Sequence, residues 1–117
     1  MRTVTFAFAG LLALAATPAW ADNRGDAKKQ VEFGIAVAQK GLWREAIYRW
    51  ERATQIDPSY AAALNNLAIA YEHEGELEKA RLAYEKALEI DPNNAYIKQN
   101  YELFKEINDR TTRSESQ

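Results

Sequence analysis

The decapeptide KALEIDPNNA at Lys86–Ala95 decides the fold of this chain, because a close copy, RATQIDPSYA, occupies Arg52–Ala61. The copies share an Ala, an Ile-Asp-Pro tripeptide and a closing Ala, and one constant offset relates Arg52 to Lys86 and Ala61 to Ala95. Spacings of this size are typical of repeat proteins, so a true period should extend to the surrounding residues.

The same offset holds well beyond the two decapeptides. Aligning residues 27–58 with residues 61–92 gives ten identities, and other positions pair residues of similar size, such as Trp50 with Tyr84. The identical pairs are Ala27/Ala61, Ile35/Ile69, Ala36/Ala70, Gly41/Gly75, Ala46/Ala80, Glu51/Glu85, Ala53/Ala87, Ile56/Ile90, Asp57/Asp91 and Pro58/Pro92. The offset is therefore a repeat period, and the chain holds two copies of one unit.

Each copy predicts two helices joined by a tight turn. In the second copy, apolar residues recur at helical spacing from Leu64 to Tyr71, and Gly75 can take the left-handed conformation that ends a helix. A second helix over residues 77–89 is expected to stop before Pro92, which disfavours helical geometry in the residue preceding it. The first copy has the same arrangement.

One further helix is predicted after the second copy. Apolar residues at helical spacing, among them Ile97 and Phe104, indicate a helix over residues 95–108 that covers the exposed face of the second copy. Ser59 is expected to cap the first helix of the second copy, and Asn93 or Asn94 the final helix. The tail, 109–117, has no apolar periodicity and is expected to be disordered.

These copies resemble the tetratricopeptide repeat family, whose motif combines large, small and aromatic residues at set positions of two helices. The second copy matches at all seven positions, with Leu67, Ala68, Tyr71, Ala80, Tyr84, Ala87 and Pro92. The first copy departs only at Val37, where an aromatic residue is usual. The resemblance implies an all-α fold, a short right-handed α-solenoid with repeats at 27–60 and 61–94 and a C-terminal capping helix at 95–108.

The N-terminal segment, residues 1–21, has the pattern of a secretory signal peptide. An apolar run over residues 4–16 is followed by Ala19 and Ala21, which form the small-x-small site that a signal peptidase cleaves. The alternative is an uncleaved membrane anchor, but the run is shorter than the roughly 20 residues that span a bilayer. We expect residues 1–21 to be removed and residues 22–26 to form a linker in a periplasmic or secreted protein. Together with the resemblance, this indicates a small exported bacterial protein of the family.

Composition argues against several functional classes. The 15 Lys and Arg against 17 Asp and Glu leave no basic excess for binding nucleic acid, and the absence of Cys excludes Cys-based metal sites. The only histidine, His73, stands between Glu72 and Glu74, so a metal site or an acid–base site of a hydrolase accessory part is one interpretation. We favour the other, an exposed polar residue near a helix end. We therefore expect no enzyme activity, no cofactor and no metal.

The resemblance also implies where a partner would bind, because the first helices of such repeats line a concave face. That face is apolar in the middle and polar at the sides, as expected of a peptide-binding groove. The predicted groove residues are Lys28, Val31, Ile35, Ala38, Gln39, Asn65, Ile69, Glu72, His73, Tyr96, Gln99 and Leu103. The alternative is that Ile35 and Ile69 are simply buried by neighbouring helices.

The function that these observations predict is that of a non-enzymatic interaction module of the bacterial cell envelope. It would bind a partner protein or peptide, but not nucleic acid, and would meet the membrane only through export. The alternative is a structural assembly subunit or homo-oligomer that docks into a larger envelope complex. Repeat arrays usually need about three units for stability, so a chain with two repeats is also expected to gain stability from a partner or from self-association.

Overall fold

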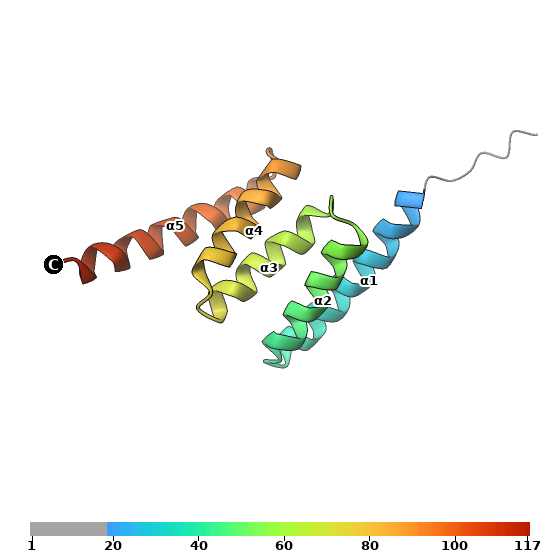
Figure 1. Ribbon diagram of the computed structural model, residues 1–117, viewed down its shortest axis with the longest axis horizontal. Coiled ribbons are helices and arrows are strands. Elements are labelled where there is room, and N and C mark those ends of the chain that lie inside the picture. The colour runs from blue at the N-terminus through green and yellow to red at the C-terminus, as the bar shows by residue number, and fades with distance from the viewer. Residues whose placement is uncertain (1–18) are drawn as a thin grey trace, which may run out of the picture.

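The computed structural model describes residues 19–117, with side chains described from residue 23 onward. Every regular element within these residues is an α-helix, as Figure 1 shows. The helices are α1 (Ala19–Gln39), α2 (Trp43–Ile56), α3 (Ala61–His73), α4 (Leu77–Ile90) and α5 (Ala95–Glu115). The predicted all-α fold class is confirmed.

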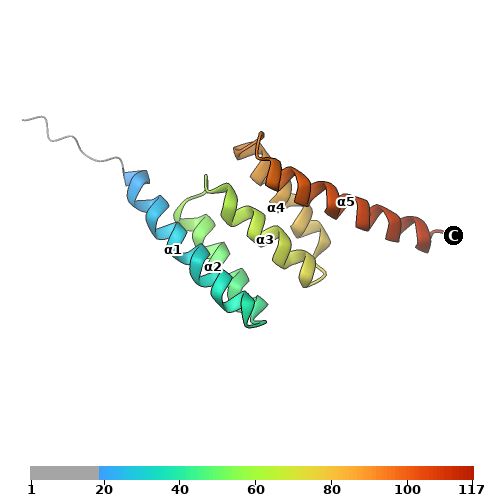
Figure 2. The same cartoon turned by 180° about the vertical axis from the view of Figure 1, so that it is seen from behind.

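The helices form two antiparallel pairs, α1 with α2 and α3 with α4, followed by the single helix α5 (Figure 1). Seen from behind, α1, α3 and α5 lie together on one face, and α2 and α4 lie on the other (Figure 2). This arrangement places the first helix of each unit beside the first helix of the next. The face formed by α1, α3 and α5 is called the first-helix face below.

Small residues allow the helices of each pair to approach closely. Ala46 of α2 and Ala80 of α4, which are equivalent in the two repeats, are fully buried. Gly34 lies against the indole of Trp50, and a Cβ at this position would lie 2.8 Å from Cδ1 of that ring and closer still to Nε1. Trp50 Nε1 donates a hydrogen bond of 3.1 Å to the carbonyl oxygen of Val31. The first repeat therefore needs glycine where the second has alanine, because tryptophan is larger than the equivalent tyrosine.

The predicted turn and stop signals are mostly confirmed. Gly41 and Gly75 have φ angles of +78° and +75°, the left-handed geometry that glycine adopts without strain. Asn94 caps α5 by accepting a hydrogen bond of 3.1 Å from the backbone N–H of Ile97. The expectation for Ser59 is wrong: α3 begins after Tyr60 without a side-chain cap, and the hydroxyl of Ser59 instead donates to Asp57.

Both ends of the described chain are more helical than the sequence predicted. Residues 22–26, expected as a linker, belong to α1, and Arg24 of this segment pairs with the Asp57 carboxylate at the end of α2. Burial would raise the pKa of Asp57, but hydrogen bonds from Arg24 and Ser59 outweigh it and hold that pKa below its usual value. The interaction fixes the start of α1 to the second helix, which explains why the segment is ordered. The predicted signal peptide lies outside the described residues except for its last three, 19–21, which begin α1.

At the other end, residues 109–115 continue α5, although a disordered tail was expected. The apolar period does end there, but polar side chains support the helix locally. Arg110 pairs with Glu106 one turn earlier, and the Thr111 hydroxyl donates to the backbone carbonyl of Ile107. Apolar periodicity reports which residues are buried, so its absence did not exclude an exposed helix.

Successive helices from α2 onward are joined by tyrosine–glutamate hydrogen bonds. The hydroxyl groups donate to carboxylates over 2.6–2.9 Å. The pairs are Tyr71 with Glu51, Tyr84 with Glu72 and Tyr101 with Glu85. Burial, and then the hydrogen bond to the carboxylate, raises the pKa of each of these tyrosines.

Candidate binding groove

An apolar pocket opens on the first-helix face between α1 and α3. Its volume is about 330 Å³, and α2 contributes to its wall. Four of the predicted groove residues line it: Ile35, Ala38, Gln39 and Ile69. Three further lining residues were not predicted: Trp43, Trp50 and Asn66. We call this site the groove pocket.

The two isoleucines are not core residues. Ile35 is 41% exposed, and its equivalent in the next repeat, Ile69, is only partly buried. Ile69 packs against the buried core with part of its side chain, and both residues line the pocket. The alternative that both are simply covered by neighbouring helices therefore does not describe this structure. The pocket has amide groups, from Gln39 and Asn66, among an otherwise apolar lining.

Two of the predicted groove residues are structural and cannot meet a partner. Val31 is 5% exposed, and its carbonyl oxygen accepts the hydrogen bond from Trp50. Asn65 is 2% exposed, and its side-chain oxygen accepts a hydrogen bond of 3.1 Å from Asn100 of α5. Both occupy the same position of their repeats, which faces the adjoining helix rather than the open surface. Their inclusion in the predicted groove is corrected accordingly.

The remaining predicted residues lie outside the groove pocket. Lys28 and Gln99 are exposed on α1 and α5. Tyr96 and Leu103 of α5 are 63% and 55% exposed, and neither lines the groove pocket. Glu72 accepts the hydrogen bond of Tyr84 and thereby joins α3 to α4.

His73 contacts Trp43 in the wall of the groove pocket. Its ring stacks on Trp43, with ring centroids 4.2 Å apart and planes inclined by 21°. Its Nδ1 lies 3.8 Å from a carboxylate oxygen of Glu74. Sequence reasoning missed Trp43 because only the first helices were expected to line the groove. The available signal was its bulk at the first position of a helix that directly follows the glycine turn.

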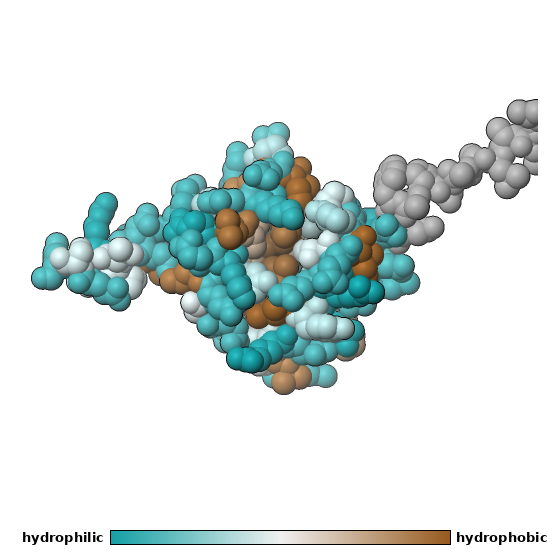
Figure 3. Space-filling model, viewed as in Figure 1, coloured by the Kyte–Doolittle hydropathy of each residue, from teal (hydrophilic) through white to brown (hydrophobic). Residues whose placement is uncertain are grey.

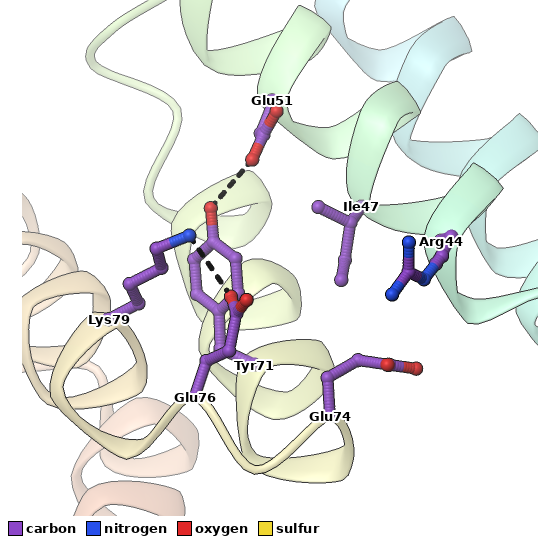
Figure 4. Close-up of a pocket in the computed structure, with 7 residues that line it drawn as sticks. All are labelled: Arg44, Ile47, Glu51, Tyr71, Glu74, Glu76 and Lys79. Atoms are coloured by element: carbon purple, nitrogen blue, oxygen red, sulfur yellow. Dashed lines mark hydrogen bonds and ion pairs between the residues drawn. The ribbon is translucent and has the colours of Figure 1, made fainter.

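A second, polar pocket of about 350 Å³ lies between α2, α3 and the start of α4 (Figure 4). Its charged groups are largely matched: Glu51 accepts the hydrogen bond of Tyr71 over 2.8 Å, and Glu76 pairs with Lys79 over 3.2 Å. The surrounding face of α2 and α4 is mainly hydrophilic, with apolar side chains showing near its centre and in separate spots at its edges (Figure 3). In this pocket, Tyr71 and Glu51 therefore satisfy each other across the α2–α3 junction, and Glu76 and Lys79 pair within the start of α4.

Within residues 19–117, no group of three or more His, Cys, Asp or Glu side chains is arranged to hold a metal ion. The helices in this part of the chain also include none that is long and apolar enough to cross a membrane.

Comparison with known families agrees with the helix pairing and the repeat period. A family model described as tetratricopeptide repeat matches residues 61–94, and a second one, described as TPR repeat, matches residues 34–75. Together the matches span residues 34–94, about half of the chain. The chain is a tetratricopeptide repeat protein. Repeats of this family form non-catalytic scaffolds that mediate protein–protein interactions. No curated protein sequence matches the chain significantly.

Proposed function

We propose that this protein is a non-enzymatic interaction module of the bacterial cell envelope that holds a partner protein or peptide in the groove pocket. The observation that supports the proposal is the exposed apolar pocket at Ile35 and Ile69, on the face where the first helices of adjacent repeats meet. Apolar surface of this kind is costly to leave in water, and a partner's side chain would cover it.

The size and chemistry of the groove pocket favour an extended segment with one anchoring side chain. A volume of about 330 Å³ admits a large apolar side chain, and the amides of Gln39 and Asn66 can each donate to and accept from a peptide backbone beside it. Binding energy at such sites is concentrated in a few well-packed anchors. The partner is therefore expected to insert a bulky apolar residue between α1 and α3.

The envelope location is proposed from the leader sequence. The apolar run and the small-x-small site before Asp22 have the form of a cleavable export signal. N-terminal sequencing of the protein recovered from the envelope fraction should begin at Asp22. Recovery of a chain that still carries residues 1–21 would contradict the proposal of cleavage.

Site-specific crosslinking in living cells tests the binding face. A photoreactive residue at position 39 should capture one partner, and Ile69→Glu should abolish that capture, because the carboxylate would lose its water on contact with an apolar anchor. Leu82→Glu is the matched control: Leu82 is 63% exposed on α4, the other face, so capture should not change. Thermal melts of both variants show whether the fold is intact.

The same experiment separates the binding module from the alternative function. In the other outcome, a photoreactive residue at position 82 is the one that captures the partner, and Ile69→Glu leaves that capture unchanged. This result would support an assembly subunit that docks through its α2–α4 face. If Ile69→Glu abolishes capture and also greatly lowers the melting temperature, Ile69 is part of the core and the proposed groove is overturned.

A further inference from the structure

The wall of the groove pocket contains an aromatic stack that joins the two repeats. Trp43 begins α2 of the first repeat, and His73 ends α3 of the second. Their rings lie 4.2 Å apart between centroids and are nearly parallel, at 21°. The His73 side chain is 52% exposed, so protons reach it directly from solvent.

The His73 imidazole lies beside a carboxylate and at the C-terminal end of α3. Nδ1 of His73 lies 3.8 Å from a carboxylate oxygen of Glu74, and the imidazole stands at the C-terminal end of a helix, where the dipole stabilises a cation. The charged groups that share a pocket with Glu74 are Arg44 and Glu45 on α2, the latter paired with Arg49, and the Glu76–Lys79 pair at the start of α4. Glu72 directly precedes His73 on α3. The α1 residues that line the groove pocket are uncharged.

None of these neighbouring groups replaces the Glu74–His73 contact. Glu72 accepts the hydrogen bond of Tyr84, and Glu76 is paired with Lys79. Arg44 shares a pocket with Glu74, and the Glu74 carboxylate lies 3.8 Å from Nδ1 of His73, a contact that becomes an ion pair only when the imidazole is protonated. The Glu74 carboxylate is thus available to a protonated imidazole.

We propose that the Trp43–His73 stack is a proton-sensitive latch on the groove pocket. When His73 gains a proton, the stack becomes a cation–π contact supported by Glu74, which holds Trp43 more firmly as the pocket wall and ties the two repeats together. When His73 is neutral, the stack loses this attraction and Trp43 moves more freely. The consequence for partner binding rests on the proposed function, whereas the change at Trp43 does not.

The chain makes this latch unusually easy to isolate, because it has one histidine and three tryptophans. The experiment measures acrylamide quenching of tryptophan fluorescence between pH 8 and pH 5, the range in which imidazoles titrate. Fluorescence lifetimes are measured as well, so that the bimolecular quenching constant can be calculated. Acrylamide is neutral, so the charge of His73 does not change its local concentration. Subtracting the signal of a Trp43→Phe variant isolates Trp43, and Trp50 is too buried to respond, at 3% exposed.

We expect the bimolecular quenching constant of Trp43 to fall by about two- to fivefold from pH 8 to pH 5. His73→Gln should remove this dependence, because glutamine keeps a polar side chain but takes up no proton. Glu74→Gln should reduce it. The wild-type protein should have a higher melting temperature than His73→Gln, and the difference should be larger at pH 5 than at pH 8. A quenching constant that does not change with pH, or changes equally in His73→Gln, would overturn the latch.

Crosslinking from position 39 at the two pH values tests the consequence for binding. Stronger capture at pH 5 in the wild-type protein, but not in His73→Gln, supports the link between latch and partner. If Ile69→Glu abolishes capture while the wild-type protein captures equally at both pH values, the proposed function stands and the link is overturned. If capture does not depend on Ile69 at all, the proposed function itself fails.

Discussion

The pairing of Gly34 with Trp50 shows how individual residues set the distance between the two helices of a repeat. The second repeat has Ala68 and Tyr84 at the equivalent positions. Its smaller tyrosine ring leaves room for the methyl group of the alanine. A Cβ at Gly34 would overlap the indole, because the ring atoms lie well inside normal contact distance of that position.

Gly34→Ala should therefore destabilise the protein by roughly 1–3 kcal/mol, the usual range for overpacking a core. Adding Trp50→Tyr recreates the pair found in the second repeat and should make the double variant more stable than Gly34→Ala alone. Urea unfolding of the two single variants and the double variant measures this coupling. If Trp50→Tyr lowers the free energy of unfolding by the same amount in Gly34→Ala as in the wild type, steric overlap with the indole is not the cause.

Helices α1 and α3 occupy equivalent places in their repeats but are covered differently. Leu67 of α3 is 4% exposed, whereas the equivalent Phe33 of α1 is 48% exposed. Helix α3 packs against α2 of the preceding repeat, and the described residues place no helix before α1. The Arg49 guanidinium lies 4.2 Å from the centre of the Phe33 ring and covers part of it. The position of a repeat in the array, rather than the residue type, therefore decides how much each of these side chains contributes to the free energy of unfolding.

Leu67→Ala should therefore lower the free energy of unfolding by about 2–5 kcal/mol, as expected for truncating a buried leucine. Phe33→Ala removes a larger side chain but should cost only roughly 1 kcal/mol, because the ring is half exposed and its cation–π contact is at the surface. Chemical denaturation of both variants provides the comparison. A cost for Phe33→Ala that equals or exceeds that of Leu67→Ala would show that the outer face of α1 is covered in solution.

The tyrosine–glutamate pairs predict how the helix junctions respond to alkali. Burial and the hydrogen bond to Glu72 raise the pKa of Tyr84 above the value of 10.0 for a free tyrosine. A raised pKa means that the folded state retains the proton more strongly than the unfolded state. The stabilisation is thus complete below about pH 10 and is lost as the pH rises further. Unfolding measured between pH 9 and pH 11 should show a steeper loss of stability in the wild-type protein than in Tyr84→Phe. Equal slopes would contradict this assignment.

For the whole molecule, α5 is both a cap and an unsupported extension. Ile97 and Phe104 of α5 are 2% and 0% exposed and complete the core over α4, with the Phe104 and Tyr84 ring centroids 5.5 Å apart. Residues 109–115 are helical but fully on the surface. The helix therefore has two parts with different roles in stability.

Removal of residues 109–117 should leave the melting temperature nearly unchanged and reduce the helical signal in circular dichroism. Removal of residues 95–117 should unfold the second repeat, because a repeat unit buries its apolar face only against neighbours. The first truncation is the control for the second. A large fall in melting temperature after the shorter truncation would show that the extension contacts another part of the protein or a second copy. The gain in stability from self-association thus stays a prediction that this pair of variants can test.

The sequence by itself determined the repeat period, the helix pairs, the glycine turns and the class of protein. These features depend on contacts within one repeat or between equivalent neighbours, so they recur at the constant offset that relates residues 27–58 to residues 61–92. The family resemblance assigned Ile35, Ala38, Gln39 and Ile69 to the concave face, and these four residues line the pocket between α1 and α3.

The tertiary structure alone decided which predicted groove positions are open and what completes the pocket. Val31 and Asn65 are closed off by Trp50 and Asn100, which come from different helices at no repeating offset. Trp43 and His73 meet across the junction between repeats, and nothing in either local sequence indicates that the two rings stack. Contacts of this kind depend on how the whole core positions the helices, so the repeat period of the sequence does not predict them.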